Sequence, residues 1–220
     1  MQYENHIGIN SEKSKYFKEL NSLLKIKNAK NCSLIRIGTP NGDGGYMMAD
    51  NFKNGKIAYS FGISDNADWE NDIANLSYQV FMYDHTIDKL PLENKNFHFF
   101  KNGISAIDTN NSPLKTLQYY IRQNGHEAEQ NMLLKLDVEG YEWGVFETIS
   151  TDTLKQFSQI VVEFHNLLGV NEKFLKILEK INSTHHLIHT HKNDLSISVQ
   201  IDDINIPNVL EATYINKNIH

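Results

Sequence analysis

Short apolar runs alternate with amphipathic stretches of helix length along most of the chain, and this alternation restricts the fold more than any other feature. The clearest runs cover Lys56–Phe61, Gln79–Tyr83, Met132–Leu136 and Gln159–Phe164. Runs of this length that are apolar throughout are typical of strands buried on both faces, and the amphipathic segments between them supply helices that cover such a sheet. The sequence therefore predicts an α/β fold with a mainly parallel sheet.

The other elements are expected around this sheet. We expect helices over Ser14–Leu24, Trp69–Leu76, Pro113–Gln123, Glu142–Ile149 and Glu172–Ile181, and further strands over Ser33–Ile37, Asn96–Lys101, His186–Thr190, Ser196–Gln200 and Leu210–Ile215. Ser112 is expected to cap the helix that begins with Pro113. The last two strands are predicted to form an antiparallel, hairpin-like ending. We divide the chain into an N-terminal helical segment, residues 1–32, and one domain, residues 33–220.

Composition and charge exclude several classes of function. A chain of 220 residues that is 40% hydrophobic fits one large domain with a sizeable core. Its net charge of −6 gives no basic surface for a nucleic-acid backbone, so no nucleic-acid partner is predicted. No stretch approaches the roughly 20 apolar residues of a membrane span, and the N-terminus has no apolar signal-peptide core. We therefore expect a cytoplasmic protein.

Two strand ends point to a nucleoside ligand. Gly62 begins the turn after the first core strand, and Asp84 ends the next strand. A glycine turn followed at this spacing by a carboxylate is typical of a βαβ nucleotide site. The phosphate-binding Gly-x-Gly-x-x-Gly is absent, which disfavours a dinucleotide and favours a nucleoside without phosphates, such as S-adenosylmethionine. The plainer alternative is that Asp84 is an ordinary loop acid.

Acidic residues follow two other strands. "LLKLDVEGYEW" places Asp137, Glu139 and Glu142 after one strand, and "VVEFHNL" places Glu163 and His165 at the end of the next. Carboxylates this close repel each other unless a cation or a donor joins them. Asp137, Glu163 and His165 form a mixed oxygen and nitrogen set suited to a divalent cation such as Mg²⁺ or Mn²⁺. The alternatives are that His165 is a free general base, and that the acids lie in a solvated turn where Glu142 begins a helix.

The stretch "PNGDGGYMMAD" looks like a phosphate cradle because it holds three glycines, but it lies before the first core strand. A phosphate-binding loop follows that strand and opens a helix. We therefore interpret Pro40–Tyr46 as a tight turn between the strand Ser33–Ile37 and a second extended piece. It is either a plain hairpin loop or a lid over the active site. In the second case Asp43 and Tyr46, with Arg36 behind them, touch the cofactor or the acceptor.

Six segments, in this order along the chain, carry a family resemblance. They are "RIGTPNGDGGYMMAD", "YSFGISDNADWE", "FMYDHT", "LLKLDVEGYEWGVFETI", "VVEFHNL" and "IPNVLEATYI". Together they resemble the FkbM-type, or methyltransferase-21-like, group of S-adenosylmethionine-dependent methyltransferases. The resemblance implies a class I methyltransferase fold: a Rossmann-like three-layer sandwich around a seven-stranded, mostly parallel sheet with an antiparallel last strand. It also implies S-adenosylmethionine as the cofactor.

The resemblance further implies roles for single residues. The loop after the first core strand would hold the methionine part of the cofactor, and the acid that ends the second strand would bind the ribose. The cofactor-binding residues implied in this way, together with the two lid residues, are Phe61, Gly62, Ile63, Ser64, Asp84, His85, Asn102, Gly103, Asp137, Asp43 and Tyr46. "LDVEGYE" is also similar to a segment of metal-dependent sugar O-methyltransferases. That similarity makes Asp137 a metal ligand and Glu139 the base, with Glu163 or His165 completing the metal site.

The function predicted from these features is methyl transfer to a hydroxyl of a sugar or of a polysaccharide or natural-product precursor, with a divalent cation assisting. The expected catalytic residues are Asp137, Glu139 and His165. A cation on Asp137 would lower the pKa of the acceptor hydroxyl, or Glu139 or His165 would accept its proton. The alternatives are another small-molecule acceptor methylated at nitrogen or phosphate, an NAD-dependent Rossmann oxidoreductase, and a binding module without activity.

Overall fold

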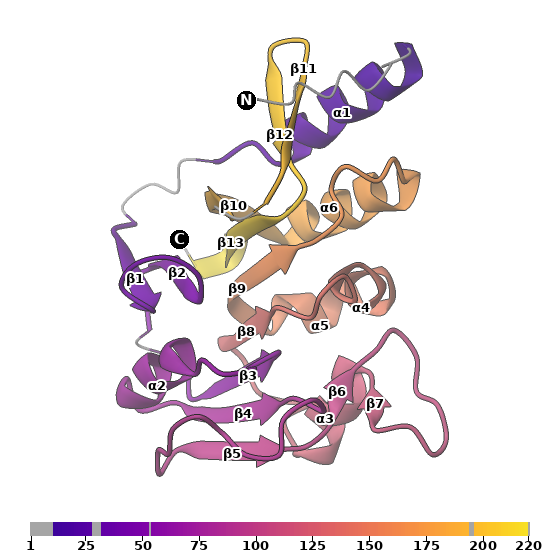
Figure 1. The fold of residues 1–220 in the computed structure, drawn as a ribbon. Coiled ribbons are helices and arrows are strands. Elements are labelled where there is room, and N and C mark those ends of the chain that lie inside the picture. Colours follow the sequence, from indigo (N-terminus) through magenta and orange to yellow (C-terminus); the bar gives the residue numbers. More distant parts are fainter. Residues whose placement is uncertain (1–10, 28–31, 53, 194–195, 220) are drawn as a thin grey trace.

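The computed structural model describes residues 11–27, 32–52, 54–193 and 196–219, and its centre is a seven-stranded sheet in the order β10-β13-β9-β8-β3-β4-β5 (Figure 1). The strands are β3 (Ile57–Phe61), β4 (Gln79–Tyr83), β5 (Phe97–Phe100), β8 (Met132–Leu136), β9 (Phe157–Phe164), β10 (His185–Lys192) and β13 (Leu210–Asn216). Every pair from β9 to β5 is parallel. β13 runs antiparallel to both β9 and β10. The mostly parallel sheet with an antiparallel last strand, predicted for a class I methyltransferase, is thus confirmed.

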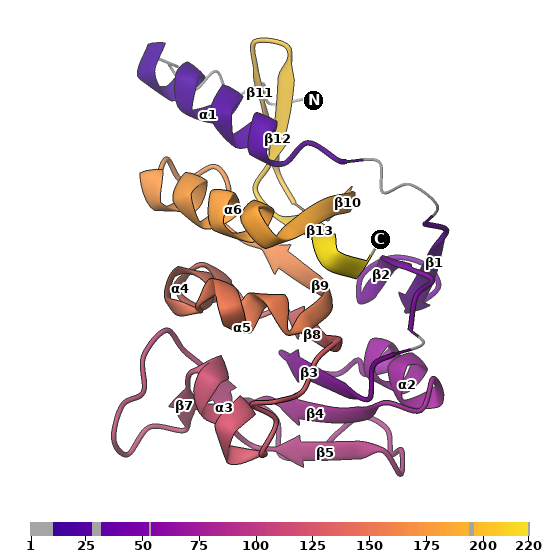
Figure 2. The ribbon, with the colours of Figure 1, turned by 180° about the vertical axis from the view of Figure 1, so that it is seen from behind.

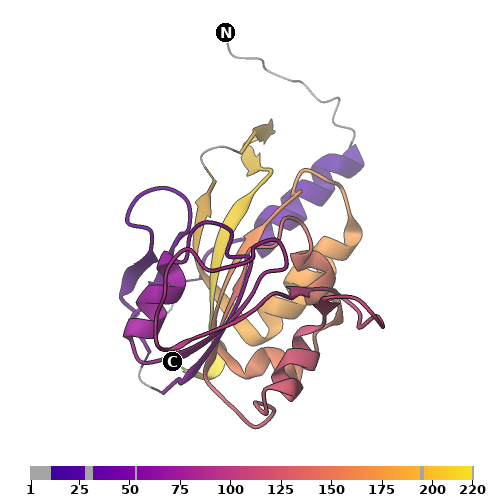
Figure 3. The same cartoon turned by 60° about the horizontal axis from the view of Figure 1, so that its bottom comes forward.

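Two layers cover opposite faces of this sheet (Figures 2 and 3). One face carries α1 (Ser11–Leu23), α3 (Leu117–Gln123), α4 (Glu142–Thr148), α5 (Thr151–Lys155) and α6 (Glu172–Thr184), and the other carries α2 (Asp68–Asn75) and a hairpin. Because side chains alternate along a strand, Tyr59 and Phe61 lie in the core beneath the first set of helices, while Ala58 lies in the core beneath α2. The predicted three-layer sandwich is confirmed.

The hairpin consists of β1 (Leu34–Gly38) and β2 (Gly45–Ala49). It forms where the glycine-rich stretch was interpreted as a turn between two extended pieces. Arg36 braces the turn: its Nε donates to the Thr39 carbonyl at 2.6 Å and its Nη2 to the Gly42 carbonyl at 2.7 Å. The far end is fixed to the sheet, because the Gln159 amide exchanges two hydrogen bonds with the Ala49 backbone, at 2.8 and 2.9 Å. The turn of residues 39–44 is therefore held firmly in place.

The N-terminal helix α1 packs on α6 and joins the main core. Tyr16, Phe17 and Leu20 are buried in that core, and Asn182 Nδ2 donates to the Leu23 carbonyl at 2.8 Å. Residues 1–10 and 28–31 of the predicted N-terminal segment lie outside the described residues. No helix in the described part of the chain combines the length and the apolar character needed to cross a membrane.

One predicted helix begins later than expected. The helix expected from Pro113 begins at Leu117, and Thr116 caps it by accepting a hydrogen bond from Tyr119 N at 3.1 Å. The Ser112 hydroxyl accepts instead from the backbone amide two residues further along, at 3.1 Å, which closes a local turn. The residues in between form a short parallel pair with an earlier segment. That pair is β6 (Gly103–Ile104) with β7 (Leu114–Lys115).

The predicted hairpin-like ending is wrong. The strand β11 (Ser198–Ile201) pairs with β12 (Ile204–Pro207), which the sequence did not indicate, and β13 inserts between β9 and β10. Burial explains the difference. All residues of β13 are buried, so this strand needs a neighbour on each side, whereas β11 is mostly half-exposed and suits a two-stranded pair outside the sheet.

Candidate functional site

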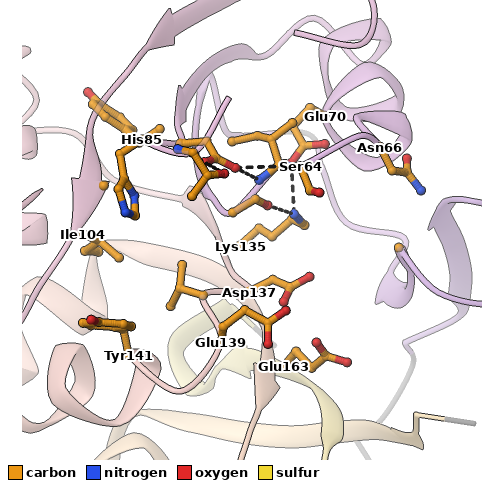
Figure 4. Close-up of a pocket in the computed structure, with 18 of the residues that line it drawn as sticks. Ser64, Asn66, Glu70, His85, Ile104, Lys135, Asp137, Glu139, Tyr141 and Glu163 are labelled. Atoms are coloured by element: carbon orange, nitrogen blue, oxygen red, sulfur yellow. Dashed lines mark hydrogen bonds and ion pairs between the residues drawn. The ribbon is translucent and has the colours of Figure 1, made fainter. Parts of the chain in front are cut away.

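A cavity of about 550 Å³ opens at the carboxyl ends of β3, β4 and β8 (Figure 4). Its walls come from the turn after β3, the end of β4, the β6–β7 pair, the segment after β8 and the turn of the β1–β2 hairpin. The carboxyl ends of parallel strands are where an open α/β sheet binds its ligands. Of the residues predicted for the site, Asp43, Gly62, Ile63, Ser64, Asp84, His85, Gly103, Asp137, Glu139 and Glu163 line this cavity.

Four predicted residues lie outside the cavity wall. Phe61 is fully buried in the core, and Tyr46 is 2% exposed. Asn102 donates its side-chain amide to the Pro113 carbonyl at 3.1 Å. His165 lies behind the acids that face the cavity, and its side chain is 12% exposed. The roles of these four residues toward a cofactor or an acceptor stay predictions.

Asp84 shapes the turn after β3. Its Oδ2 accepts hydrogen bonds from Ile63 N at 2.9 Å and Ser64 N at 3.0 Å. Its Oδ1 accepts from the Thr86 amide at 2.8 Å and the Thr86 hydroxyl at 2.6 Å. Burial alone would raise the pKa of Asp84, but these donors outweigh it and lower the pKa below its ordinary value. A carboxylate offers about four lone-pair positions, so protein donors complete the coordination of Asp84 by themselves.

Gly62 brings the two halves of the cavity into contact. It has a φ of +82°, and a Cβ atom at this position would lie 1.6 Å from the Asp137 carbonyl oxygen. Asp137 N in turn donates to the Phe61 carbonyl at 3.0 Å. Only glycine fits where the turn after β3 crosses the end of β8.

Lys135 lies beneath this crossing. Its Nζ donates to the Gly62 carbonyl at 2.6 Å and lies 3.3 Å from Glu70 Oε1, which also accepts from the Ser60 hydroxyl. Although burial favours the neutral amine, the charges of Glu70 and Asp137 raise the pKa of Lys135 above its ordinary value. The sequence analysis did not single out this pair. The charged residue inside the apolar run "LLKLD" was the signal that could have found it.

The other end of the cavity gathers acids. Asp137, Glu163 and His165 bring one ligand atom each within 4.8 Å of one another, as expected of a cation site. His165 Nε2 lies 3.2 Å from Glu163 Oε2 and 3.4 Å from Glu139 Oε2. The Tyr46 hydroxyl donates to Asp137 Oδ2 at 3.5 Å. Figure 4 shows Asp137, Glu139 and Glu163 close together, at a distance from the turn that carries Ser64.

Glu142 orients His165, and the sequence analysis assigned it no such role. Its side chain is completely buried. Its Oε1 accepts from His165 N at 2.6 Å and lies 3.1 Å from His165 Nδ1, and its Oε2 accepts from Gly140 N at 2.9 Å. A metal-binding histidine commonly donates its second ring N–H to a carboxylate in this way. The solvated turn considered as an alternative does not form at Glu142, and the ring is held with Nε2 toward Glu139 and Glu163.

Crowding shifts the pKa values at this end. Burial and the Glu163 carboxylate raise the pKa of Asp137 to about 7. Burial and Glu163 likewise raise the pKa of Glu211, on β13, to about 8. Although burial favours the neutral imidazole, contacts with Glu142 and Glu163 raise the pKa of His165 to about 10. In the absence of another cation, protons compensate the charge of these acids.

The sheet order and the cavity at its carboxyl edge are those of the class I methyltransferase fold. The particular family follows from the sequence as a whole: the family model described as the methyltransferase FkbM domain matches residues 49–188. This match covers more than half of the chain, and the chain therefore belongs to the FkbM methyltransferase domain family. It is an S-adenosylmethionine-dependent methyltransferase, as the resemblance implied.

Solved structures that are similar to this chain have low sequence identity and low TM-scores. A Burkholderia thailandensis 1,6-didemethyltoxoflavin-N1-methyltransferase, with 1,6-didemethyltoxoflavin and S-adenosylhomocysteine bound, is 9% identical with a TM-score of 0.38, covering 74% of this chain and 72% of its own. A predicted O-methyltransferase of Agrobacterium tumefaciens is 8% identical with a TM-score of 0.41, covering 77% of each chain. A 16S rRNA (adenine(1408)-N(1))-methyltransferase mutant of Catenulisporales acidiphilia is 8% identical with a TM-score of 0.36, covering 83% of this chain and 98% of its own. No curated protein matches the chain.

Proposed function

We propose that this protein transfers the methyl group of S-adenosylmethionine to a hydroxyl of a sugar or of a polysaccharide or natural-product precursor, with a divalent cation assisting. The observation that carries the proposal is the contact between two differently built ends of one cavity. The turn after β3, at Gly62, lies directly against the backbone of Asp137, and Asp137 is one of the acids at the other end of the cavity. A cofactor on the turn and an acceptor on the acids would therefore lie next to each other, as methyl transfer requires.

We assign the cofactor to the end of the cavity formed by β3 and β4. The methionine part would lie on the turn of Gly62–Ser64. The ribose hydroxyls would replace the Thr86 hydroxyl as donors to Asp84, because that side chain can rotate away while the amides of Ile63 and Ser64 maintain the turn. The adenine would lie between His85 and the apolar side chains of Ile104 and Leu114, which line the same cavity.

We assign the cation to Asp137, Glu163 and His165. Their oxygen and nitrogen donors suit a hard or borderline divalent ion, and Glu142 directs His165 Nε2 toward the other two ligands. When bound, such a cation would supply Lewis acidity that lowers the pKa of the acceptor hydroxyl. Glu139 is 86% exposed beside this group, and it would accept the hydroxyl proton.

A nitrogen acceptor is the second candidate, and charge is the observation that favours it. Asp43, Asp137, Glu139 and Glu163 all line the cavity. Carboxylates attract an ammonium group and repel a phosphate, and one of them would accept the ammonium proton so that the free amine attacks the methyl group. The same charge disfavours a phosphate acceptor, which the sequence left open as an alternative, and it supports the prediction that nucleic acid is not a partner. A cytoplasmic location likewise stays a prediction. Membership in a methyltransferase family removes the NAD-dependent oxidoreductase as an alternative.

The test is methyl transfer from radiolabelled S-adenosylmethionine to panels of sugars, nucleotide sugars and small amines, with Mg²⁺ or Mn²⁺ and with a chelator. We expect transfer to a hydroxyl acceptor. The chelator should suppress this transfer, and Asp137→Asn and His165→Gln should each lower its rate strongly. Asp152→Asn, which changes an exposed acid paired with Lys155, is the matched control and keeps full activity. Full activity in the two site variants would overturn the assignment, and transfer to amines alone would replace the acceptor class.

A further inference from the structure

We propose a second divalent-cation position beside the first, held by Asp43, Glu163 and Glu211. One carboxylate oxygen from each of these residues lies within 4.8 Å of the others. Glu163 belongs to this group and also to the group of Asp137 and His165. The geometry therefore points to a pair of cations with Glu163 as the shared ligand. Ligands that are all carboxylate oxygens select a hard cation, Mg²⁺ or Mn²⁺.

The fold itself forces these acids together. Glu163 on β9 and Glu211 on β13 are direct cross-strand partners, and like charges directly opposite each other destabilise a sheet. The turn of the β1–β2 hairpin then adds Asp43, and Arg36 fixes that turn through the Thr39 and Gly42 carbonyls. Three carboxylates from three separate segments therefore lie close together, although each added negative charge increases the repulsion among them.

Glu211 provides an independent sign of a missing ligand. Its side chain is 6% exposed, and no hydrogen bond between described residues reaches its carboxylate. Its one ion-pair neighbour in the described part of the chain is His191 Nδ1 at 3.4 Å, and that nitrogen is itself buried without a hydrogen-bond partner. Burying a carboxylate without donors is costly. A cation at this position would coordinate the oxygen that the protein leaves without a donor.

In the described part of the chain, no hydrogen bond from Arg36 or Lys135 reaches these three carboxylates. Arg36 donates to two carbonyls of the hairpin turn, and Lys135 donates to the Gly62 carbonyl and pairs with Glu70. Glu163 has Oε1 directed at Asn193, which donates to it at 2.8 Å, and Oε2 directed at His165. Its two oxygens thus face different sides, which is the orientation that a shared ligand needs.

A second cation also narrows the kind of acceptor, and this narrowing rests on the proposed methyl transfer to a hydroxyl. A second cation would give the cavity a second binding point for oxygen, close to the first. Hard cations take oxygen ligands, so two cations that share one carboxylate would lie close enough for each to bind one oxygen of the same acceptor. We therefore infer an acceptor that presents two adjacent oxygens, such as a vicinal diol of a sugar.

The experiment counts Mn²⁺ bound to protein stripped with a chelator, by electron paramagnetic resonance of the free ion, and records the low-temperature spectrum of the bound ions. We expect two Mn²⁺ per chain with an exchange-coupled spectrum. Glu211→Gln and Asp43→Asn should each bind one Mn²⁺ with an uncoupled spectrum. Glu179→Gln, which changes an exposed acid on α6, is the control and should bind two.

Thermal melting of each variant shows whether a loss of Mn²⁺ binding comes from loss of a ligand or from unfolding. Asp43 lies in an exposed turn, so Asp43→Asn still tests the proposal if Glu211→Gln does not fold. One Mn²⁺ or none in the wild type, or two in Asp43→Asn or Glu211→Gln, would overturn the proposal. Binding of S-adenosylhomocysteine in chelator, measured on the same samples, reports on the cofactor site alone. A failure of the second cation is therefore distinguishable from a failure of the proposed methyl transfer.

Discussion

The carboxylates at the two ends of the cavity have opposite surroundings, and their pKa values are shifted in opposite directions. Asp84 receives hydrogen bonds to both of its oxygens from groups within the protein, and its pKa lies below the ordinary value. Asp137 and Glu211 are crowded by other acids, and their pKa values are raised to about 7 and about 8. The first end is electrostatically complete without a ligand, whereas at the second end burial and neighbouring acids favour the protonated forms of Asp137 and Glu211.

This difference indicates what each end binds. A turn whose amides are already fixed by a carboxylate presents a rigid surface, and a rigid surface suits a ligand recognised by its shape. Crowded carboxylates are stable only with protons or cations. The cofactor and the cation are therefore assigned to separate ends, and Gly62 is the residue at which the ends touch.

The largest expected effect comes from breaking that contact with Gly62→Ala. The added Cβ would lie 1.6 Å from the Asp137 carbonyl oxygen, and no side chain can rotate to relieve a clash with backbone. We expect the free energy of unfolding, measured with urea, to fall by roughly 2–5 kcal/mol. Gly42→Ala is a matched control, since Gly42 has a φ of +81° and open space around it. It should cost only about 1–2 kcal/mol, and equal losses in the two variants would refute the steric account.

The same substitution, Asp to Asn, can be made at each end of the cavity in protein kept in chelator. Asp84→Asn places an amide where four donors converge, so we expect a loss of about 1–3 kcal/mol in the free energy of unfolding. Asp137→Asn removes a charge from a crowded group and should leave stability unchanged or raised. Urea unfolding at pH 8 measures both. A larger loss in Asp137→Asn than in Asp84→Asn would contradict the distinction between the two ends.

The pH dependence at Asp84 has a defined sign. Because the folded-state pKa is lower than the unfolded one, the stabilisation is fully present above the unfolded value of about 4. It is lost as the pH falls from there through the folded pKa. The stability difference between wild type and Asp84→Asn should therefore shrink in acid. Urea unfolding in a series of buffers below pH 5 measures it, and a constant difference would show that the charge of Asp84 is not what stabilises the turn.

Glu142→Gln affects the acidic end alone. The amide keeps the size of the side chain but removes the charge that orients the His165 ring. We expect cation affinity to fall about 10–100-fold, measured by titration with Mn²⁺, while S-adenosylhomocysteine binds as in the wild type. The exposed Glu147 on α4 provides a control, as Glu147→Gln should change neither ligand. A loss of both ligands in Glu142→Gln would indicate a general disruption of the fold.

The smallest expected effect is at Thr86. Thr86→Val removes one of the hydrogen bonds to Asp84, the one from the hydroxyl at 2.6 Å, and leaves the backbone donors in place. We expect a loss of about 0.5–1.5 kcal/mol in the free energy of unfolding. Thr148→Val, at an exposed hydroxyl on α4, is the control. A loss above that of Asp84→Asn would mean that Thr86 acts through something other than the carboxylate.

The sequence predicted the central strands well and the peripheral elements less well. The bounds of β4 and β8 are those predicted, because apolar runs buried on both faces leave little freedom in where a strand begins and ends. The strand β11 was predicted, but its partner β12 was missed because β12 is short and partly exposed, and the β11–β12 hairpin was therefore missed as well. Both Ser112 and Thr116 have a hydroxyl that can cap a helix, and only the pairing of β7 with β6 decides between them.

Site residues were predictable where they follow a strand in a recognisable motif, as Asp84 and Asp137 do. Glu142 and Glu211 were not. Glu142 lies in the first turn of a helix, where an acid is usually solvated, and only the fold shows that it is buried against His165. Glu211 lies inside β13, and its position opposite Glu163 exists only because β13 inserts beside β9 in antiparallel register. Long-range strand order of this kind leaves no local pattern in the sequence.

The most direct test of the account is calorimetric titration of S-adenosylhomocysteine into protein kept in chelator. The central claim is that the cofactor end is complete by itself, with Asp84 fully hydrogen-bonded and the turn after β3 already formed. We expect one S-adenosylhomocysteine to bind per chain without any divalent cation, and we expect Asp84→Asn to weaken this binding about tenfold or more, or by about 1.4 kcal/mol. Binding that requires Mn²⁺, or that Asp84→Asn leaves unchanged, would contradict it.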